Sequence, residues 1–208
     1  MKIPKIIFQK SKKSIPDSNQ VRQIISKCNG WTYIHYDNKQ AIQFFNDNYV
    51  EEFKDIIDKF NKMPTGAHGA DLFRYYHLWI TGGVFIDDDA MIKINIENIV
   101  KDYEFFSVKS SYVPNAIFQG FIGATAKNDI IYRALKDAYN INIDSLSECY
   151  FLLCYNLNNI INSFGKNYHL YSEGYYDDGC AKCLNDDGEI ILLHYYKHKI
   201  IPYEYIKD

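Results

Sequence analysis

Short apolar runs alternate with stretches of helical spacing along the first sixty residues of the chain. Apolar and β-branched residues predict a first strand within residues 2–9 and a second within 31–36. Between them, a polar cap followed by apolar positions at helical spacing predicts a helix over about 17–28. A further helical pattern runs over 38–60 and ends before Pro64. The elements therefore alternate as β-α-β-α.

A buried helix and a buried strand are predicted next, and after them helices and strands no longer alternate regularly. Residues 67–80 have a broad apolar face that predicts a helix, and Val84-Phe85-Ile86 after Gly82-Gly83 predicts a buried strand. Further elements are expected as strands over 103–108 and 116–124, helices over 128–138 and 146–164, and strands over 168–171 and 189–195. We predict an α/β fold with a Rossmann-like mixed sheet flanked by helices.

Length and charge narrow the class of protein. The 208 residues are expected to form one domain, 1–208, and a net charge of −3 with scattered lysines argues against a surface built for nucleic acid. No apolar run approaches the roughly 20 residues that span a bilayer, and the start MKIPKIIFQ lacks the layout of a signal peptide. We expect a soluble protein with no transmembrane segment and no nucleic-acid partner.

Three consecutive carboxylates follow the apolar run that ends at Ile86. Because side chains alternate along a strand, Asp87 and Asp89 would share one face while Asp88 points the other way. Two carboxylates on one face attract a divalent ion such as Mg²⁺ or Mn²⁺, whose remaining ligands are commonly water and substrate phosphates. A solvated acidic turn is the alternative. The place of the triplet after a buried strand favours the metal site, because ligands of open α/β sheets lie at the carboxyl ends of strands.

Asp71 and Arg74 stand three residues apart on one side of the helix predicted over 67–80. Spacing alone favours an ordinary helix salt bridge, worth a few tenths of a kcal/mol. A functional role for this pair needs evidence from outside the spacing.

Five cysteines, an odd number, are spread along the chain without the density of a disulfide scaffold. We expect reduced thiols. Cys180 and Cys183 have the spacing of a zinc or redox motif, but a structural zinc site needs four ligands, and the nearest other pair is Cys149 and Cys154.

The order of residues around the acidic triplet resembles the DXD-containing sugar transferases of glycosyltransferase family 32. This family includes yeast mannosyltransferases, animal α1,4-galactosyltransferases and the glucosylating domains of large clostridial toxins. The matching positions are Ala70-Asp71, Arg74-Tyr75, Gly82-Gly83, Phe85 and Asp87-x-Asp89. The opening Ile3-Pro4-Lys5-Ile6-Ile7-Phe8-Gln9 is similar to the family's IPKIIHQ, with Phe8 in place of His. Weaker similarity continues at Phe118-Gln119-Gly120-Phe121 and His194-Tyr195-Tyr196.

This resemblance implies a GT-A fold, with a nucleotide-sugar-binding half over about 1–110 and an acceptor-side half over about 111–208. It implies transfer of a hexose from a nucleotide-diphosphate sugar, with UDP-hexose as the expected donor and GDP as the other nucleotide found in the family. Mn²⁺ or Mg²⁺ would be the cofactor, and a glycan, protein or lipid the acceptor. Retention of the anomeric configuration is also implied.

The resemblance also assigns roles to the aspartates of the motif, which would be the catalytic carboxylates. Asp89 would bind the metal directly, and Asp87 would bind it through water or bind the ribose hydroxyls. His194 would contact the metal or a phosphate, the alternative being a strand-end histidine with no ligand role.

Further donor contacts are implied for both halves of the chain. Asp71 and Arg74 would hydrogen-bond the hydroxyls of the donor sugar. Phe8 and Gln9 would contact the nucleotide of the donor, and Gln119 would contact the donor sugar or the acceptor.

Two other classes of protein stay open. Haloacid-dehalogenase phosphatases also use Asp-x-Asp after a strand, but they place it on the first strand, and Asp177-Asp178 could imitate only their later acidic pair. The other is a nucleotide-sugar or glycan binding module without turnover. We expect a cytoplasmic microbial or viral enzyme, or a Golgi-type lumenal one if the sequence is an excised domain.

Overall fold

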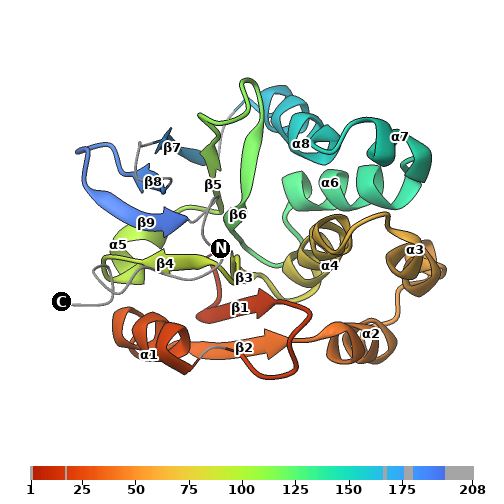
Figure 1. Ribbon diagram of the computed structural model, residues 1–208, viewed down its shortest axis with the longest axis horizontal. Coiled ribbons are helices and arrows are strands. Elements are labelled where there is room, and N and C mark those ends of the chain that lie inside the picture. The colour runs from red at the N-terminus through yellow and green to blue at the C-terminus, as the bar shows by residue number, and fades with distance from the viewer. Residues whose placement is uncertain (1, 17, 166–167, 176–179, 195–208) are drawn as a thin grey trace.

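The computed structural model describes residues 2–16, 18–165, 168–175 and 180–194. Within them a mixed sheet has the strand order β2-β1-β3-β6-β5-β7-β8-β9-β4 (Figure 1). The strands are β1 (Ile6–Lys10), β2 (Thr32–Tyr36), β3 (Gly83–Ile86), β4 (Ala90–Ile92), β5 (Phe105–Lys109), β6 (Ile117–Ala124), β7 (His169–Tyr175), β8 (Ala181–Leu184) and β9 (Ile190–His194). The predicted fold class, a mixed α/β sheet flanked by helices, is confirmed.

Strand directions divide the sheet into two parts. β1 pairs in parallel with β2 and β3, as in a Rossmann-like half. β6 is antiparallel to both β3 and β5, and β7 is parallel to β5. β7, β8, β9 and β4 then follow as an antiparallel series. The carboxyl ends of β1 and β3 therefore lie at the same edge of the sheet.

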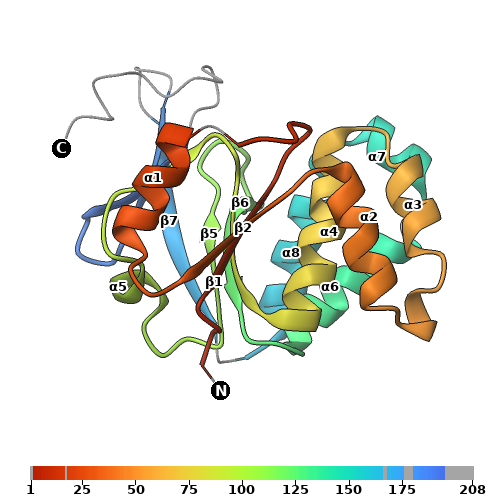
Figure 2. The ribbon, with the colours of Figure 1, turned by 90° about the horizontal axis from the view of Figure 1, so that it is seen from below.

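Helices cover the two faces of the sheet unequally. The helices are α1 (Ser18–Lys27), α2 (Asn38–Asp47), α3 (Ile56–Lys62), α4 (Gly66–Thr81), α5 (Ile96–Val100), α6 (Asp129–Asn140), α7 (Ile143–Glu148) and α8 (Leu152–Ser163). Figure 2 shows α1 and α5 on one side of the strands and the other helices on the opposite side.

Alternation along the central strands supplies the core on both faces. On β3, Phe85 packs into the cluster under the larger helical layer, while Val84 and Ile86 pack into the cluster under α1 and α5. On β1, Phe8 packs under the larger helical layer and Ile7 packs under α1 and α5. These strands are buried on both sides, which explains why they read as continuous apolar runs.

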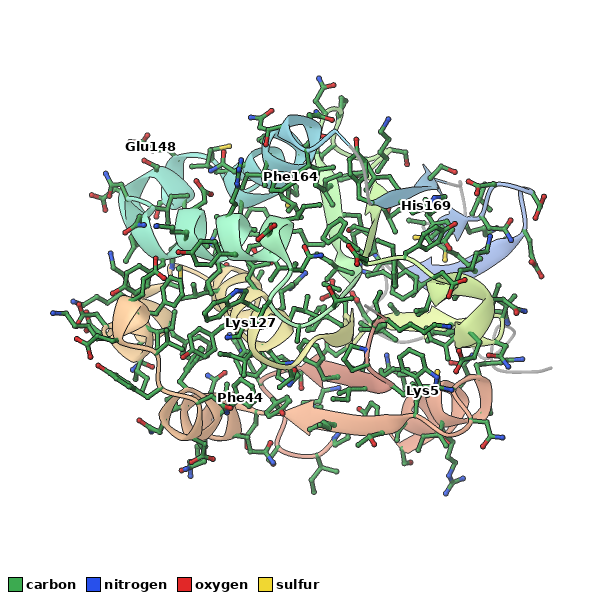
Figure 3. All side chains as sticks on the ribbon, turned by 180° about the vertical axis from the view of Figure 1, so that it is seen from behind. Lys5, Phe44, Lys127, Glu148, Phe164 and His169 are labelled. Atoms are coloured by element: carbon green, nitrogen blue, oxygen red, sulfur yellow. The ribbon has the colours of Figure 1, made fainter. Side chains whose placement is uncertain are left out.

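Aromatic contacts fix the larger helical layer against the sheet. His77 of α4 is stacked between Phe8 of β1, with ring centroids 3.7 Å apart, and Phe44 of α2, at 4.5 Å (Phe44 is labelled in Figure 3). The ammonium of Lys127, also labelled there, lies 3.3 Å from the centroid of Trp79 and ties the start of α6 to the end of α4. The position of α4 on the sheet is thus strongly determined.

Two long helical regions predicted from periodicity are divided in the structure. The region 38–60 breaks after α2, where Asn48 caps the helix by donating from its side chain to the carbonyl of Phe44, and it continues as a 3-10 turn and α3. The region 146–164 breaks between α7 and α8. In both cases the pieces pack on the same core, so the apolar spacing continues across the break. The short elements β4, α5 and β8 were not predicted.

The described residues include all five cysteines, and each is a free thiol, as expected. In the same part of the chain, no group of three or more potential metal ligands includes Cys180 or Cys183. No described helix is both long and apolar enough to cross a bilayer.

Candidate metal centre and adjoining cavities

The acidic triplet lies between the carboxyl end of β3 and the start of β4, and its first residue is held from two sides. The amide of Asp87 donates to the carbonyl of Gly120 on β6 at 2.8 Å. The side-chain amide of Gln9, on the neighbouring strand β1, donates to the carbonyl of Asp87 at 2.9 Å, and Gln9 accepts from the hydroxyl of Tyr33 at 2.7 Å. Asp87 therefore has a fixed backbone.

Pairing of β4 with β9 brings a histidine to the triplet. Ala90 lies opposite His194, and this places His194 Nε2 2.9 Å from Asp89 Oδ1 and 3.7 Å from Asp87 Oδ2. One ligand atom from each of these three residues lies within 4.8 Å of the others, and Asp88 does not belong to the group. The structure thus brings together the three residues predicted as metal ligands.

The two carboxylates of this cluster repel each other. Burial raises the pKa of Asp87, the Asp89 carboxylate adds to that rise, and Arg74 and His194 act against it. Burial by itself lowers the pKa of His194, but the hydrogen bond and charge of Asp89 outweigh it, so the pKa of His194 is raised. A divalent cation would relieve the repulsion between the two carboxylates.

Arg74 connects the helix pair to the metal-ligand cluster. Its Nη2 lies 3.1 Å from Asp71 Oδ1 and 3.5 Å from Asp87 Oδ1, and its guanidinium lies 4.1 Å from the ring centroid of Phe85. The guanidinium also donates to the carbonyl of Gln119. The salt bridge favoured from spacing is present, but it is buried and shared with the triplet, unlike an ordinary surface pair.

Gln119 and Gly120, on β6, complete this side of the cluster. The side chain of Gln119 accepts from the Tyr75 hydroxyl at 2.7 Å and donates to the Cys154 sulfur at 3.4 Å. A Cβ on Gly120 would stand 2.3 Å from Asp87 Oδ2, so only glycine lets the carboxylate approach β6 this closely. Sequence reasoning missed Gly120, and the signal available was a glycine inside an otherwise apolar strand.

Phe8 was expected to contact the donor, and the structure corrects this expectation. The residue has no exposed surface and is packed against His77 and Phe85 in the core. Alternation along β1 turns the side chain at position 8 toward the helices, and it lines neither of the two cavities described next. Gln9 reaches the site through the backbone of Asp87 instead.

Two cavities meet at the metal-ligand cluster. The smaller, of about 330 Å³, has walls that include Asp71, Arg74, Tyr112, Gln119, Phe151 and His194. The larger, of about 600 Å³, has walls that include Lys10, Lys12, Lys13, Gly66, Arg74 and Asp88. Both are lined by Arg74, Asp87 and Asp89. A molecule spanning both cavities would pass the cluster at its middle.

A mixed α/β sheet with an Asp-x-Asp cluster at a strand end, between two cavities, agrees with the fold and the site that the sequence resemblance implied. Residues 16–106 match the family described as the glycosyltransferase sugar-binding region containing the DXD motif. This stretch of the chain is thus similar to the DXD glycosyltransferases, and the resemblance seen in the sequence is confirmed. The Asp-x-Asp follows β3 and not the first strand, which argues against a haloacid-dehalogenase phosphatase. Asp177-Asp178, like Tyr195 and Tyr196, lies outside the described residues.

Individual relatives agree with this family. The chain is 26% identical over 147 residues to inositol phosphoceramide mannosyltransferase 1 of Schizosaccharomyces pombe, covering 68% of this chain and 44% of the relative. It is 26% identical over 145 residues to an uncharacterized glycosyltransferase of Acanthamoeba polyphaga mimivirus, covering 66% of this chain and 56% of the relative. The chain thus spans about half the length of the curated relatives it matches.

A solved structure shares the fold. The PaToxG glycosyltransferase superimposes with a TM-score of 0.51 at 17% identity, over 77% of this chain and 74% of that one. At this identity the likeness supports the fold alone.

Proposed function

We propose that the protein transfers a hexose from a nucleotide-diphosphate sugar, with UDP-hexose as the first candidate donor, to an acceptor hydroxyl in a metal-dependent reaction. One observation carries this proposal: Asp87 and Asp89, inside the region 16–106 that matches the DXD family, converge with His194 where two cavities meet. We also propose that 1–208 acts as one domain, with donor contacts mainly from 1–110 and acceptor contacts from 111–208.

The ligand set suits a divalent ion. Two carboxylates and one imidazole supply oxygen and nitrogen donors within 4.8 Å of one another. Mg²⁺ is bound mainly by oxygen ligands, so the imidazole of His194 favours Mn²⁺ between the two expected ions. When bound, the ion would neutralise the negative charge that develops on the diphosphate as the bond to the sugar breaks, an effect worth several kcal/mol.

Asp71 and Arg74 are proposed to orient the donor sugar. Both line the smaller cavity, and both are nearly buried, with side-chain exposures of 12% and 5%. A buried carboxylate and guanidinium can accept from and donate to sugar hydroxyls in fixed directions. Because Arg74 also contacts Asp87, the orientation of the sugar is coupled to the position of the metal ligand.

Retention of the anomeric configuration is part of the proposal. It rests on the family resemblance and needs no separate catalytic base, since the leaving diphosphate can take the proton of the acceptor hydroxyl. The partly exposed aromatic rings of Tyr112 and Phe151, at the wall of the smaller cavity, are available to an acceptor. The acceptor is a glycan, a protein or a lipid, and the ceramide named for the fission-yeast relative makes a glycolipid one of the first to test.

The test is nucleotide release from a panel of UDP- and GDP-sugars, with Mn²⁺ or with a chelator. We expect slow metal-dependent hydrolysis of one donor, and we expect Asp89→Asn to abolish it while the circular dichroism spectrum is unchanged. Asp144→Asn, at an exposed position of α7, is the matched control. Metal-dependent nucleotide binding without turnover would favour a binding module, and phosphate release from simple phosphoesters would favour a phosphatase.

A further inference from the structure

Lys10, the last residue of β1, is a buried cation that forms no close ion pair with the described carboxylates. It is only 7% exposed, and its ammonium makes no hydrogen bond or ion pair with any described residue. Its nearest favourable contact is the ring of Phe60, whose centroid lies 5.3 Å away. Removing a charged group from water is costly unless a partner compensates. The pKa of Lys10 is lowered by burial first and then by the positive charges of Lys12 and Arg74, and the carboxylates of Asp88 and Asp37 offset only part of this shift.

Other positive groups converge on the same cavity. Lys12 lies against the start of α4, since a Cβ on Gly66 would stand 2.9 Å from Lys12 Cε. Gly66 and Ala67 line the cavity too, and they form the first turn of a helix of 16 residues. The amides of a first helical turn have no intrahelical acceptor, and the helix dipole makes this end positive. Two lysines and a helix N-terminus repel one another unless an anion lies between them.

The acidic triplet lines the larger cavity as well. Its lining includes four basic side chains, Lys10, Lys12, Lys13 and Arg74, against three carboxylates. A divalent ion at Asp87 and Asp89 would leave the cavity with a clear excess of positive charge. The larger cavity thus combines the candidate metal site with a buried ammonium that forms no ion pair or hydrogen bond with a described residue.

We propose that the larger cavity holds the diphosphate of the donor, with Lys10 donating to it. This inference rests on the proposed function and gives the donor a direction: the diphosphate lies by Lys10, Lys12 and the first turn of α4, and the sugar extends past Arg74 into the smaller cavity. Lys10 then places a positive charge of the protein next to the leaving diphosphate, in addition to the charge of the metal ion.

A role in binding the diphosphate would account for a lysine at a buried position where an ammonium lowers the stability of the fold. A buried ammonium without a partner weakens the fold, so replacing Lys10 by Met, which keeps the length and the apolar stem, should leave the melting temperature unchanged or raise it. A purely structural lysine would show the reverse. Stability and ligand binding therefore respond in opposite directions if Lys10 is a ligand-binding residue.

The experiment is titration calorimetry of the full chain with UDP, GDP and inorganic pyrophosphate, each with Mn²⁺. Charge-assisted hydrogen bonds contribute enough that we expect Lys10→Met to weaken the binding of the diphosphates that the wild type binds by about 10-fold to 100-fold. Lys10→Arg should recover part of the affinity. Lys39→Met, at an exposed position of α2, is the matched control and should bind as the wild type does.

The outcomes separate this inference from the proposed function. Wild-type binding of a nucleoside diphosphate with unchanged affinity in Lys10→Met would overturn the role of Lys10 and leave the transferase proposal standing. Failure of the wild type to bind any of the three ligands would overturn both. Equal loss in Lys10→Met and Lys39→Met would also contradict the inference, because it would show a general effect of net charge.

Discussion

Replacing Gly120 by alanine should damage the metal site while leaving the fold in place. The new methyl group would stand 2.3 Å from Asp87 Oδ2 and 2.3 Å from the Phe118 ring. Non-bonded atoms are comfortable at about 3.5 Å, so the carboxylate has to move by about 1 Å. The ring of Phe118 must shift too, and its centroid lies 4.4 Å from that of His194. Two of the three ligand-bearing side chains are therefore displaced together.

The size of the effect follows from how strictly such sites are positioned. A misplacement of 1 Å at a reacting centre can cost about 100-fold in rate, or about 2.7 kcal/mol of transition-state stabilisation. The cost to stability should be smaller, no more than about 2 kcal/mol, because the displaced atoms are the ends of side chains and because alanine reduces the entropy of the unfolded chain. Activity and stability are thus expected to separate.

The assay compares kcat/KM for Mn²⁺-dependent nucleotide release with the free energy of unfolding in urea. Gly165→Ala is the matched control, since no atom lies within 4 Å of the Cβ that it would add. The reasoning is refuted if Gly120→Ala keeps a kcat/KM within about threefold of the wild-type value, or if Gly165→Ala loses activity equally.

Two further predictions concern the core beside the site. Burial lowers the pKa of His77 to about 3, so the folded state keeps this ring neutral while the unfolded chain takes up a proton near pH 6.5. The contribution of His77 to the free energy of unfolding should therefore be full above pH 6.5 and fall by up to about 1.4 kcal/mol per pH unit between there and pH 3. Urea titrations at several pH values should show that the free energy of unfolding falls less steeply with decreasing pH in His77→Gln than in the wild type. An equally steep fall in both proteins would contradict the assignment. Phe8→Leu should lower the free energy of unfolding by about 1 kcal/mol and leave the KM for the donor unchanged, because Phe8 is core; a raised KM at unchanged stability would restore its predicted contact with the donor.

The strands and the helix around the Asp-x-Asp motif were predicted better than the short strands that pair with β9. β1, β2, α4 and β3 have strong local signals, since they are continuous apolar runs or a long helix bounded by turn residues. β4 and β8 have three and four residues and, unlike the similarly short β3, follow no Gly-Gly pair that marks where a strand begins. β4 becomes a strand by pairing with β9, about one hundred residues further along the chain, a contact that no local pattern contains. β8 pairs with β9 across a short turn and with β7 on its other side.

The residues of the candidate site also differ in how well the sequence predicted them. Asp87 and Asp89 were predicted from local spacing, and Arg74 from the family resemblance. The resemblance also indicated His194, but its place beside Asp89 depends on the β4–β9 register. Phe8 was assigned by its place in a matching segment, and the alternation of β1 decided against it. Gly120 and Lys10 matter through what lies next to them in space; a glycine within a strand was the one sequence signal for Gly120, and Lys10 had none.

The central claim is that a divalent ion lies among Asp87, Asp89 and His194 and faces the diphosphate of an activated sugar. Crystals grown with Mn²⁺ and UDP, measured near the manganese absorption edge, test it most directly. The account predicts an anomalous peak bound by these three side chains, with phosphate density on the side of Lys10. An anomalous peak elsewhere in a crystal whose nucleotide is bound, or nucleotide bound away from both cavities, would contradict it.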